Sequence, residues 1–79
     1  MVVEVADTSL AYDQNVKTVL YAQAGIEEYW LVNLMGNVVT LYRQPEEGVY
    51  RSVQTAAKGE SVSPLAFPDV VVPVDAVLG

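Results

Sequence analysis

Two side chains near the N-terminus, Glu4 and Lys17, could do chemistry together. Glu4 interrupts the apolar stretch VVEVA, where an ionised carboxylate is costly unless it is paired, hydrogen-bonded or bound to a metal. A carboxylate can bind a divalent cation, and a nearby lysine can stabilise negative charge that develops on a phosphoryl group or orient an attacking water. The pair therefore indicates the chemistry of metal-assisted phosphodiester hydrolysis, provided that the fold brings Lys17 beside Glu4.

Both residues also have simpler interpretations. Glu4 could lie at the edge of a sheet or at the end of a strand and face water. Asp13 and Lys17 stand at positions i and i+4 of the expected helix, where an ordinary ion pair contributes about 0.3 kcal/mol. The residues by themselves leave the catalytic and the structural interpretation open.

A strand, a helix and a second strand must position these groups. The stretch from Val2 to Ala6 is rich in valine, and its alternation places Glu4 on the face opposite Val3 and Val5. Because both faces are mostly apolar, we expect this strand to be covered on both sides. Residues 7–9, which are Asp, Thr and Ser, end the strand, and each of these residue types can cap a helix.

The helix is expected to begin between residues 9 and 13, to run to Ala24 and to end at Gly25. Its apolar stripe would be formed by Val16, Val19, Leu20 and either Gln23 or Ala24. A second buried strand follows over 29–34, and this order predicts a right-handed βαβ crossover with parallel strands.

The remainder of the chain predicts a β-hairpin and an extended tail. The hairpin strands span 38–43 and 49–54 around a loop over 44–48, and an extended piece over 70–72 precedes one helical turn over 73–78. We expect Tyr29 and Trp30 in the core and a solvated Glu27 and Glu28, although Glu28 could instead bond to neighbouring backbone. Cross-strand packing is expected of the hairpin side chains Tyr42, Arg43 and Tyr50.

Composition narrows the possible functions. The 79 residues include no Cys and no His, which excludes disulfides, Cys/His zinc sites and Ser-His-Asp triads. Four Lys and Arg against ten Asp and Glu give a net charge of −6, a poor match for DNA phosphates. Apolar runs are far shorter than the ~20 residues of a membrane span, and no secretory signal is visible, so we expect a cytoplasmic protein. Because 52% of the residues are hydrophobic, we also expect a homo-oligomer.

The order of several short motifs resembles the C-terminal half of the Uma-type putative restriction endonucleases, of the PD-(D/E)XK nuclease superfamily. The similarity extends to the Val39–Arg43 stretch and the Pro-punctuated tail, and so covers nearly the whole chain. The matching motifs are Val3-Glu4-Val5, Thr8-Ser9, Tyr12-Asp13, Lys17, Tyr21, Ala24-Gly25-Ile26 and Glu28-Tyr29-Trp30-Leu31-Val32-Asn33.

The resemblance implies an α/β (α+β) restriction-endonuclease-like half-domain and a Mg²⁺-dependent DNA endonuclease. Glu4 would be the metal-binding acid, Lys17 would replace the signature lysine at Ala6, and Asp13 would support them. The family's Pro-Asp hairpin would precede residue 1 and would cover one side of the first strand. Asp69 follows Pro68 but matches the family's tail, and Asn33 replaces a usual Asp.

We therefore expect one truncated nuclease-like domain over 1–79, with a βαβ unit over 1–34, a hairpin over 35–57 and a tail over 58–79. Without the Pro-Asp carboxylate the site would be catalytically incomplete, and efficient DNA cleavage is not expected. Two alternatives stay open. A dimer could supply the missing carboxylate in trans, or the chain could be a non-catalytic self-associating or regulatory binding module.

Overall fold

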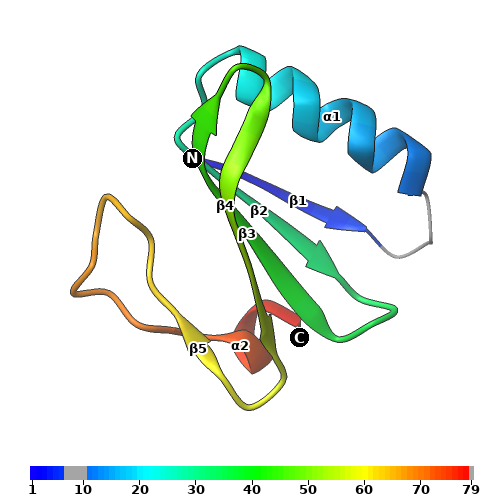
Figure 1. Ribbon diagram of the computed structural model, residues 1–79. Coiled ribbons are helices and arrows are strands. Elements are labelled where there is room, and N and C mark those ends of the chain that lie inside the picture. The colour runs from blue at the N-terminus through cyan, green and yellow to red at the C-terminus, as the bar shows by residue number, and fades with distance from the viewer. Residues whose placement is uncertain (7–10, 79) are drawn as a thin grey trace.

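The computed structural model describes residues 1–6 and 11–78 of the chain, and the side chains of residues 1–5 and 16–78. It confirms the expected mixed α/β fold (Figure 1). A four-stranded sheet with strand order β1-β2-β3-β4 forms the centre, and a two-stranded sheet pairs β5 with β6. The elements in chain order are β1 (Val2–Ala6), α1 (Ala11–Gln23), β2 (Glu28–Asn33), β3 (Val38–Glu46), β4 (Val49–Ala57), β5 (Ser61–Val62), β6 (Val72–Pro73) and α2 (Val74–Leu78).

Strands β1 and β2 are parallel, as the strand–helix–strand order predicts. Val2 lies opposite Tyr29 and Glu4 opposite Leu31. Helix α1 connects the two strands and ends at Gly25, which has a φ of 75°. The Ile26 amide donates to the Tyr21 carbonyl and the Gly25 amide to the Ala22 carbonyl, the two bonds of a Schellman motif. The glycine therefore ends the helix where the sequence indicates, while residues 7–9, the expected caps, lie outside the described residues.

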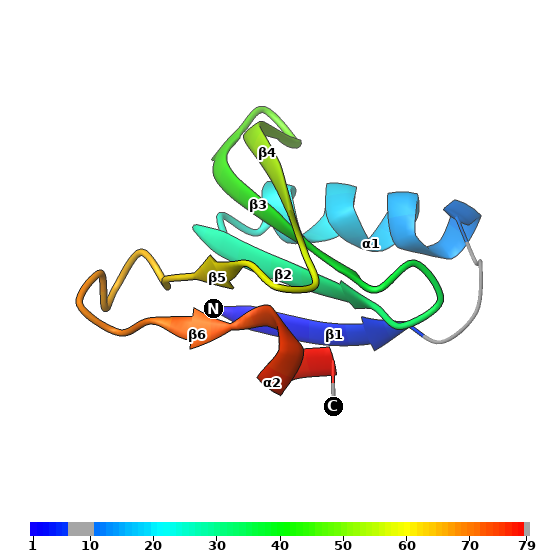
Figure 2. The same ribbon diagram turned by 90° about the horizontal axis from the view of Figure 1, so that it is seen from below.

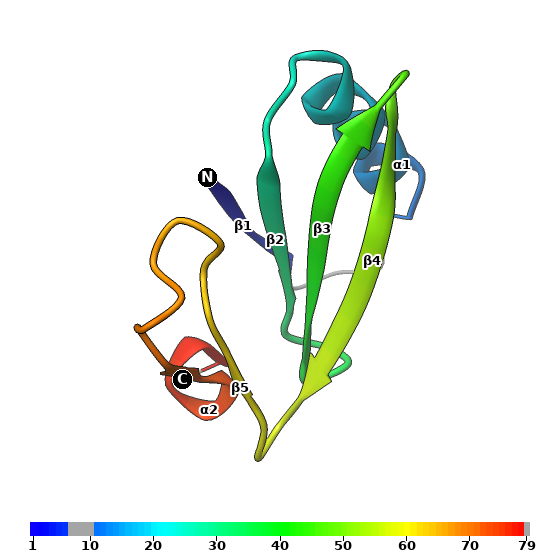
Figure 3. The same cartoon turned by 60° about the vertical axis from the view of Figure 1, so that its left-hand side comes forward.

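The β3–β4 hairpin is longer than the sequence analysis predicts. The expected loop over 44–48 is wrong, because Pro45 pairs with Tyr50 and Glu46 with Val49. Only Glu47 and Gly48 form the turn, with φ of 53° and 78°. Positive φ at both central residues is the type I′ pattern, whose twist matches that of the flanking strands. The result is a long twisted ribbon that continues the sheet beyond β2 (Figure 3).

Each face of the sheet has its own core, and α1 and α2 lie on opposite faces (Figure 2). On the α2 face, Trp30, Val32, Val39 and Leu41 pack with Val62 and Val74. On the α1 face the core consists of Ala22, Tyr29, Leu31 and Tyr50, with Val2, Tyr21 and Tyr42 against them. The expected burial of Tyr29 and Trp30 is thus confirmed, and the two residues point to opposite sides of β2.

Two burial predictions are wrong. The aliphatic stripe of α1 faces solvent, with Leu20 55% exposed, and the helix instead packs through Tyr21 and Ala22. Within the part of the chain that the structure describes, strand β1 lies at the edge of the sheet and is covered on one face alone, as the 48% and 65% exposure of Val3 and Val5 shows. Tyrosine rings from the sheet fill the space under α1, and the valines of the helix are therefore not part of this core.

The tail returns to the sheet through short pairings. Val62 of β5 pairs with Val72 of β6, and the Val74 amide at the start of α2 donates to the Glu60 carbonyl at 2.8 Å. The expected terminal helical turn is present as α2, which buries Val74 completely. The tail thus provides the layer that covers Trp30.

Candidate active site

Glu4 and Lys17 are in direct contact. Glu4 lies on β1 with its side chain toward α1, and Lys17 lies on α1. The Lys17 Nζ donates to Glu4 Oε2 at 3.2 Å, across a sequence separation of 13 residues. The βαβ crossover produces this contact, since it packs the helix over the strand that carries the acid. Lys17 remains 51% exposed, so its ammonium group is accessible from solvent.

A third side chain, Tyr21, completes this group. Its hydroxyl donates to Glu4 Oε1, the oxygen that Lys17 does not contact. Lys17 and Tyr21 stand at i and i+4, so consecutive turns of α1 present them on one side of the helix. In the sequence, Tyr21 stood out only as a matching position of the family resemblance. The i, i+4 spacing from Lys17 was the signal that could have revealed it.

These contacts determine the charge state of the site. The hydrogen bond from Tyr21 is the main reason that the pKa of Glu4 lies below its ordinary value, partial burial opposes it, and Lys17 adds to the lowering. The same hydrogen bond raises the pKa of the Tyr21 hydroxyl, with burial acting in the same direction. Near neutral pH Glu4 is therefore a carboxylate and Tyr21 a protonated phenol.

Three other tyrosines form a row with Tyr21 that holds its ring in place. Tyr21 meets Tyr29 edge-on at 4.9 Å between ring centroids, and Tyr29 stacks on Tyr42 at 5.2 Å. Tyr42 in turn lies 5.7 Å from Tyr50, whose hydroxyl donates to the Ile26 carbonyl at 2.8 Å. Edge-on and offset contacts of this kind are favourable for aromatic quadrupoles. The row connects α1 to three strands of the sheet and leaves the Tyr21 hydroxyl directed at Glu4.

Tyr29 is the most enclosed member of this row. Its hydroxyl has no hydrogen-bond partner among the described residues, and its side chain is fully buried. Burial, followed by the nearby negative charge of Glu4, raises the pKa of this phenol. Tyr29 therefore stays neutral, and its ring serves as packing beneath the site.

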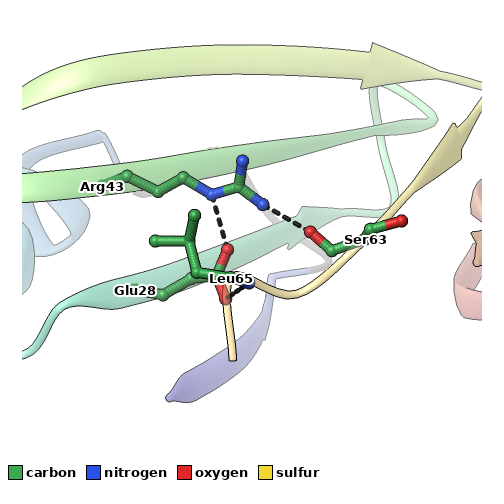
Figure 4. A network of polar contacts seen from close by, with 4 residues as sticks. All are labelled: Glu28, Arg43, Ser63 and Leu65. Atoms are coloured by element: carbon green, nitrogen blue, oxygen red, sulfur yellow. Dashed lines mark hydrogen bonds and ion pairs between the residues drawn. The ribbon is translucent and has the colours of Figure 1, made fainter. Parts of the chain in front are cut away.

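Glu28 lies apart from this site and is not the solvated residue that the sequence analysis favours. Glu28 is 4% exposed. Its cross-strand partner Arg43 compensates the buried charge by donating from Nε to Oε2 at 2.6 Å (Figure 4). The Leu65 amide donates to Oε1 at 2.9 Å, and Arg43 Nη2 donates to the Ser63 carbonyl at 2.6 Å. The alternative, that Glu28 bonds to backbone, is thus correct, with a partner 37 residues away. Arg43 forms an ion pair as well as packing across the hairpin.

The pKa of Glu28 reflects these contacts. Burial alone would raise it, but the Trp30 indole, the Leu65 amide and the Arg43 guanidinium together hold it below its ordinary value. Among the described residues the Trp30 Nε1 has no hydrogen-bond partner, so its effect on the pKa of Glu28 is that of a nearby dipole. These contacts fix the tail to β2 and β3, and Glu28 is therefore structural.

The other residues of the sequence analysis do not join the site. Asp13 is on α1, but its side chain lies outside the described residues. Asn33 accepts the Gly36 amide at 3.1 Å and so stabilises the turn after β2. Asp69 lies in the tail between β5 and β6, which follow the opposite face of the sheet.

The described residues do not form a metal site by themselves. No group of three or more Asp, Glu, His or Cys side chains is placed to hold an ion within this part of the chain. Glu4 offers one carboxylate, and both of its oxygens already accept hydrogen bonds. Mg²⁺ keeps several waters and binds protein carboxylates together with substrate phosphates. Glu4 thus fits a single ligand position, and further oxygens would have to come from elsewhere.

A comparison with protein families matches residues 1–75 to the model of Uma2, described as a putative restriction endonuclease. The chain belongs to the Uma2 family. This membership confirms the resemblance noted in the sequence and suggests a nuclease-like function. The Uma2 match includes all of the βαβ unit that brings Glu4 and Lys17 together. The comparison with curated proteins gave no match. No helix in the described part of this Uma2 chain is long and apolar enough to cross a membrane.

Proposed function

We propose that this chain carries the carboxylate–lysine part of a metal-dependent DNA endonuclease site. The contact of 3.2 Å between Lys17 Nζ and Glu4 Oε2 is the observation that supports it, because the two groups come from different elements. In this proposal Glu4 is one ligand of a Mg²⁺ ion and Lys17 stabilises negative charge on the scissile phosphate. Asp13, on the same helix, supports Lys17. The Uma2 membership supports phosphodiester hydrolysis as the reaction class.

The site that the described residues form is catalytically incomplete. A single carboxylate holds a Mg²⁺ ion poorly, and a net charge of −6 repels the DNA backbone. Additional carboxylates must therefore come from another segment or from a second copy of the chain. We expect no efficient cleavage by the chain alone, and we place the function in the cytoplasm.

The metal-binding part is tested by adding Mn²⁺ to the ¹⁵N-labelled chain and following amide line broadening. Signals near Glu4 and Lys17 should disappear first, since a bound paramagnetic ion broadens nearby nuclei. Glu4→Gln should abolish the selective loss, and Glu47→Gln, in an exposed turn, should leave it intact. Uniform broadening, or none, in the unaltered chain would mean that Glu4 is not a metal ligand.

A second candidate is a non-catalytic module that associates with itself or regulates a partner. It is favoured by the exposed valines Val3 and Val5 on the uncovered face of the edge strand β1. Light scattering after size exclusion should then show a homo-oligomer, and Val3→Thr with Val5→Thr should shift it toward monomer. A monodisperse monomer at all concentrations would reject self-association.

The two candidates also differ in their response to Glu4→Ala. If the assembly supplies a missing carboxylate in trans, metal-dependent cleavage should be found in the oligomer and lost in Glu4→Ala and Lys17→Ala. A binding module would keep its association in both variants. Cleavage that survives Glu4→Ala would contradict the endonuclease proposal.

A further inference from the structure

Tyr21 makes a hydrogen bond to the candidate acid Glu4 that its packing does not require. Its ring is already fixed by the edge-on contact with Tyr29, and that contact uses no hydroxyl. The hydroxyl nevertheless meets Glu4 Oε1 and leaves Oε2 to Lys17. Consecutive turns of α1 thus hold the two oxygens of one carboxylate separately.

We propose that Tyr21 is a positioning residue that fixes the orientation of the Glu4 carboxylate for metal binding. This inference rests on the proposed function and adds a residue to it. A Glu side chain has three rotatable bonds, and the last one is broad, so an unrestrained carboxylate can turn its oxygens freely. A hydrogen bond to each oxygen fixes the plane of the group. With Oε1 held by Tyr21, Oε2 is the oxygen that would be presented to a cation, on the side where Lys17 already contacts it.

The origin of the restraint explains why a tyrosine serves here. The row from Tyr21 through Tyr29 and Tyr42 to Tyr50 is anchored at its far end by the 2.8 Å bond to the Ile26 carbonyl. The phenol is therefore placed before any ligand arrives, and little side-chain entropy is lost when the bond forms. Hydrogen-bonding partners of metal ligands commonly contribute about 10-fold to 100-fold in metal affinity.

Tyr21→Phe tests this role, because it keeps the ring and removes the hydroxyl. Mn²⁺ affinity, from the amide broadening titration, should fall about tenfold. The matched control is Tyr42→Phe, which removes a hydroxyl from the same row without touching Glu4. Tyr42→Phe should leave the affinity unchanged. Equal affinities for Tyr21→Phe and the unaltered chain would overturn the proposal.

A second measurement needs no metal and so separates the positioning role from the proposed function. The carboxyl ¹³C signal of Glu4 should be displaced from that of the exposed Glu47, and Tyr21→Phe should move it toward the exposed value. The Tyr42→Phe control should not move it. If the unaltered chain binds no Mn²⁺ but the Glu4 signal shifts in this way, the metal proposal fails while the orienting contact stands. A Glu4 signal that is identical in Tyr21→Phe overturns the positioning role.

Discussion

Glu28 shows how a charged side chain can become part of a protein core. Its carboxylate is held by Arg43 and by the Leu65 amide, so removal of the charge would leave the guanidinium with a weaker partner. Glu28→Gln should therefore lower the free energy of unfolding by about 2 kcal/mol in urea denaturation. Glu27→Gln, at the exposed neighbouring position, should change it by less than about 0.5 kcal/mol. Equal effects of the two substitutions would contradict the structural role of Glu28.

The lowered pKa values of Glu28 and Glu4 predict that the stability of the fold depends on pH. The folded pKa values of Glu28 and Glu4 lie below the ordinary value of 4.5, so both carboxylates bind protons less readily in the folded state. Their stabilising contribution is present above 4.5 and is lost as the pH falls through the folded pKa values. Thermal melts between neutral pH and about pH 3 should show this loss.

Glu28→Gln removes one of these two carboxylates with a lowered pKa. The fall in stability below 4.5 should consequently be smaller in this variant and should retain the part that belongs to Glu4. An unchanged slope would show that Glu28 has the same proton affinity in the folded and unfolded chain.

At the scale of the elements, the tight turn between β3 and β4 is the feature most sensitive to one methyl group. Gly48 has a φ of 78°, and a Cβ placed there would lie 3.2 Å from Gln23 Cγ. Gly48→Ala should destabilise the fold by about 1 kcal/mol, because the left-handed backbone is unfavourable for alanine. Gly36→Ala is the matched control, since its Cβ would meet ordinary contacts with Asn33. A Gly48→Ala variant as stable as the control would mean that the turn relaxes.

The elements also show what could be predicted from sequence and what could not. Local signals, such as valine runs and the glycine after the helix, predicted the strand–helix–strand order and the hairpin. The prediction of the buried face of α1 was wrong because it followed the spacing of the aliphatic residues. The helix instead packs the ring of Tyr21, whose hydroxyl still reaches Glu4. Burial of Glu28 depends on Arg43 and Leu65, 15 and 37 residues away, and only the complete fold brings them together.

The candidate site was predictable to a similar extent. Chemistry singled out Glu4 and Lys17, and the packing of a crossover helix on its sheet made their contact possible. The contribution of Tyr21 required the tyrosine row, whose members come from α1, β2, β3 and β4. No local sequence pattern predicts that four tyrosine rings from four different elements will come into contact.

At the scale of the whole molecule, the sheet depends on cover from both sides. Val74 of α2 is fully buried in the core that contains Trp30, the single tryptophan of the chain. Val74→Asp would bury an unpaired carboxylate there and should cost about 3 kcal/mol or more. Trp30 fluorescence should shift to longer wavelength as water reaches the indole.

The comparison for this variant is Ala76→Asp, which places the same charge at an exposed position of α2. It should leave the Trp30 emission unchanged. Amide signals of α1 and Tyr21 should be little affected in either variant, because they belong to the core on the other face of the sheet. A simultaneous change in the Trp30 emission and in the amide signals of α1 would show that the two cores unfold as one unit.

The edge position of β1 has a consequence for how long the candidate site persists. In the part of the chain that the structure describes, this strand has β2 as its one neighbour, and five residues hold it there. Strands bonded on one side open locally at lower free energy than central ones, without global unfolding. Each such opening would carry Glu4 away from Lys17 and Tyr21 while the β2–β3–β4 sheet stayed intact. Hydrogen exchange would then show that the site opens and closes independently of global unfolding. Any partner that pairs with β1 would lengthen the time that the site spends assembled.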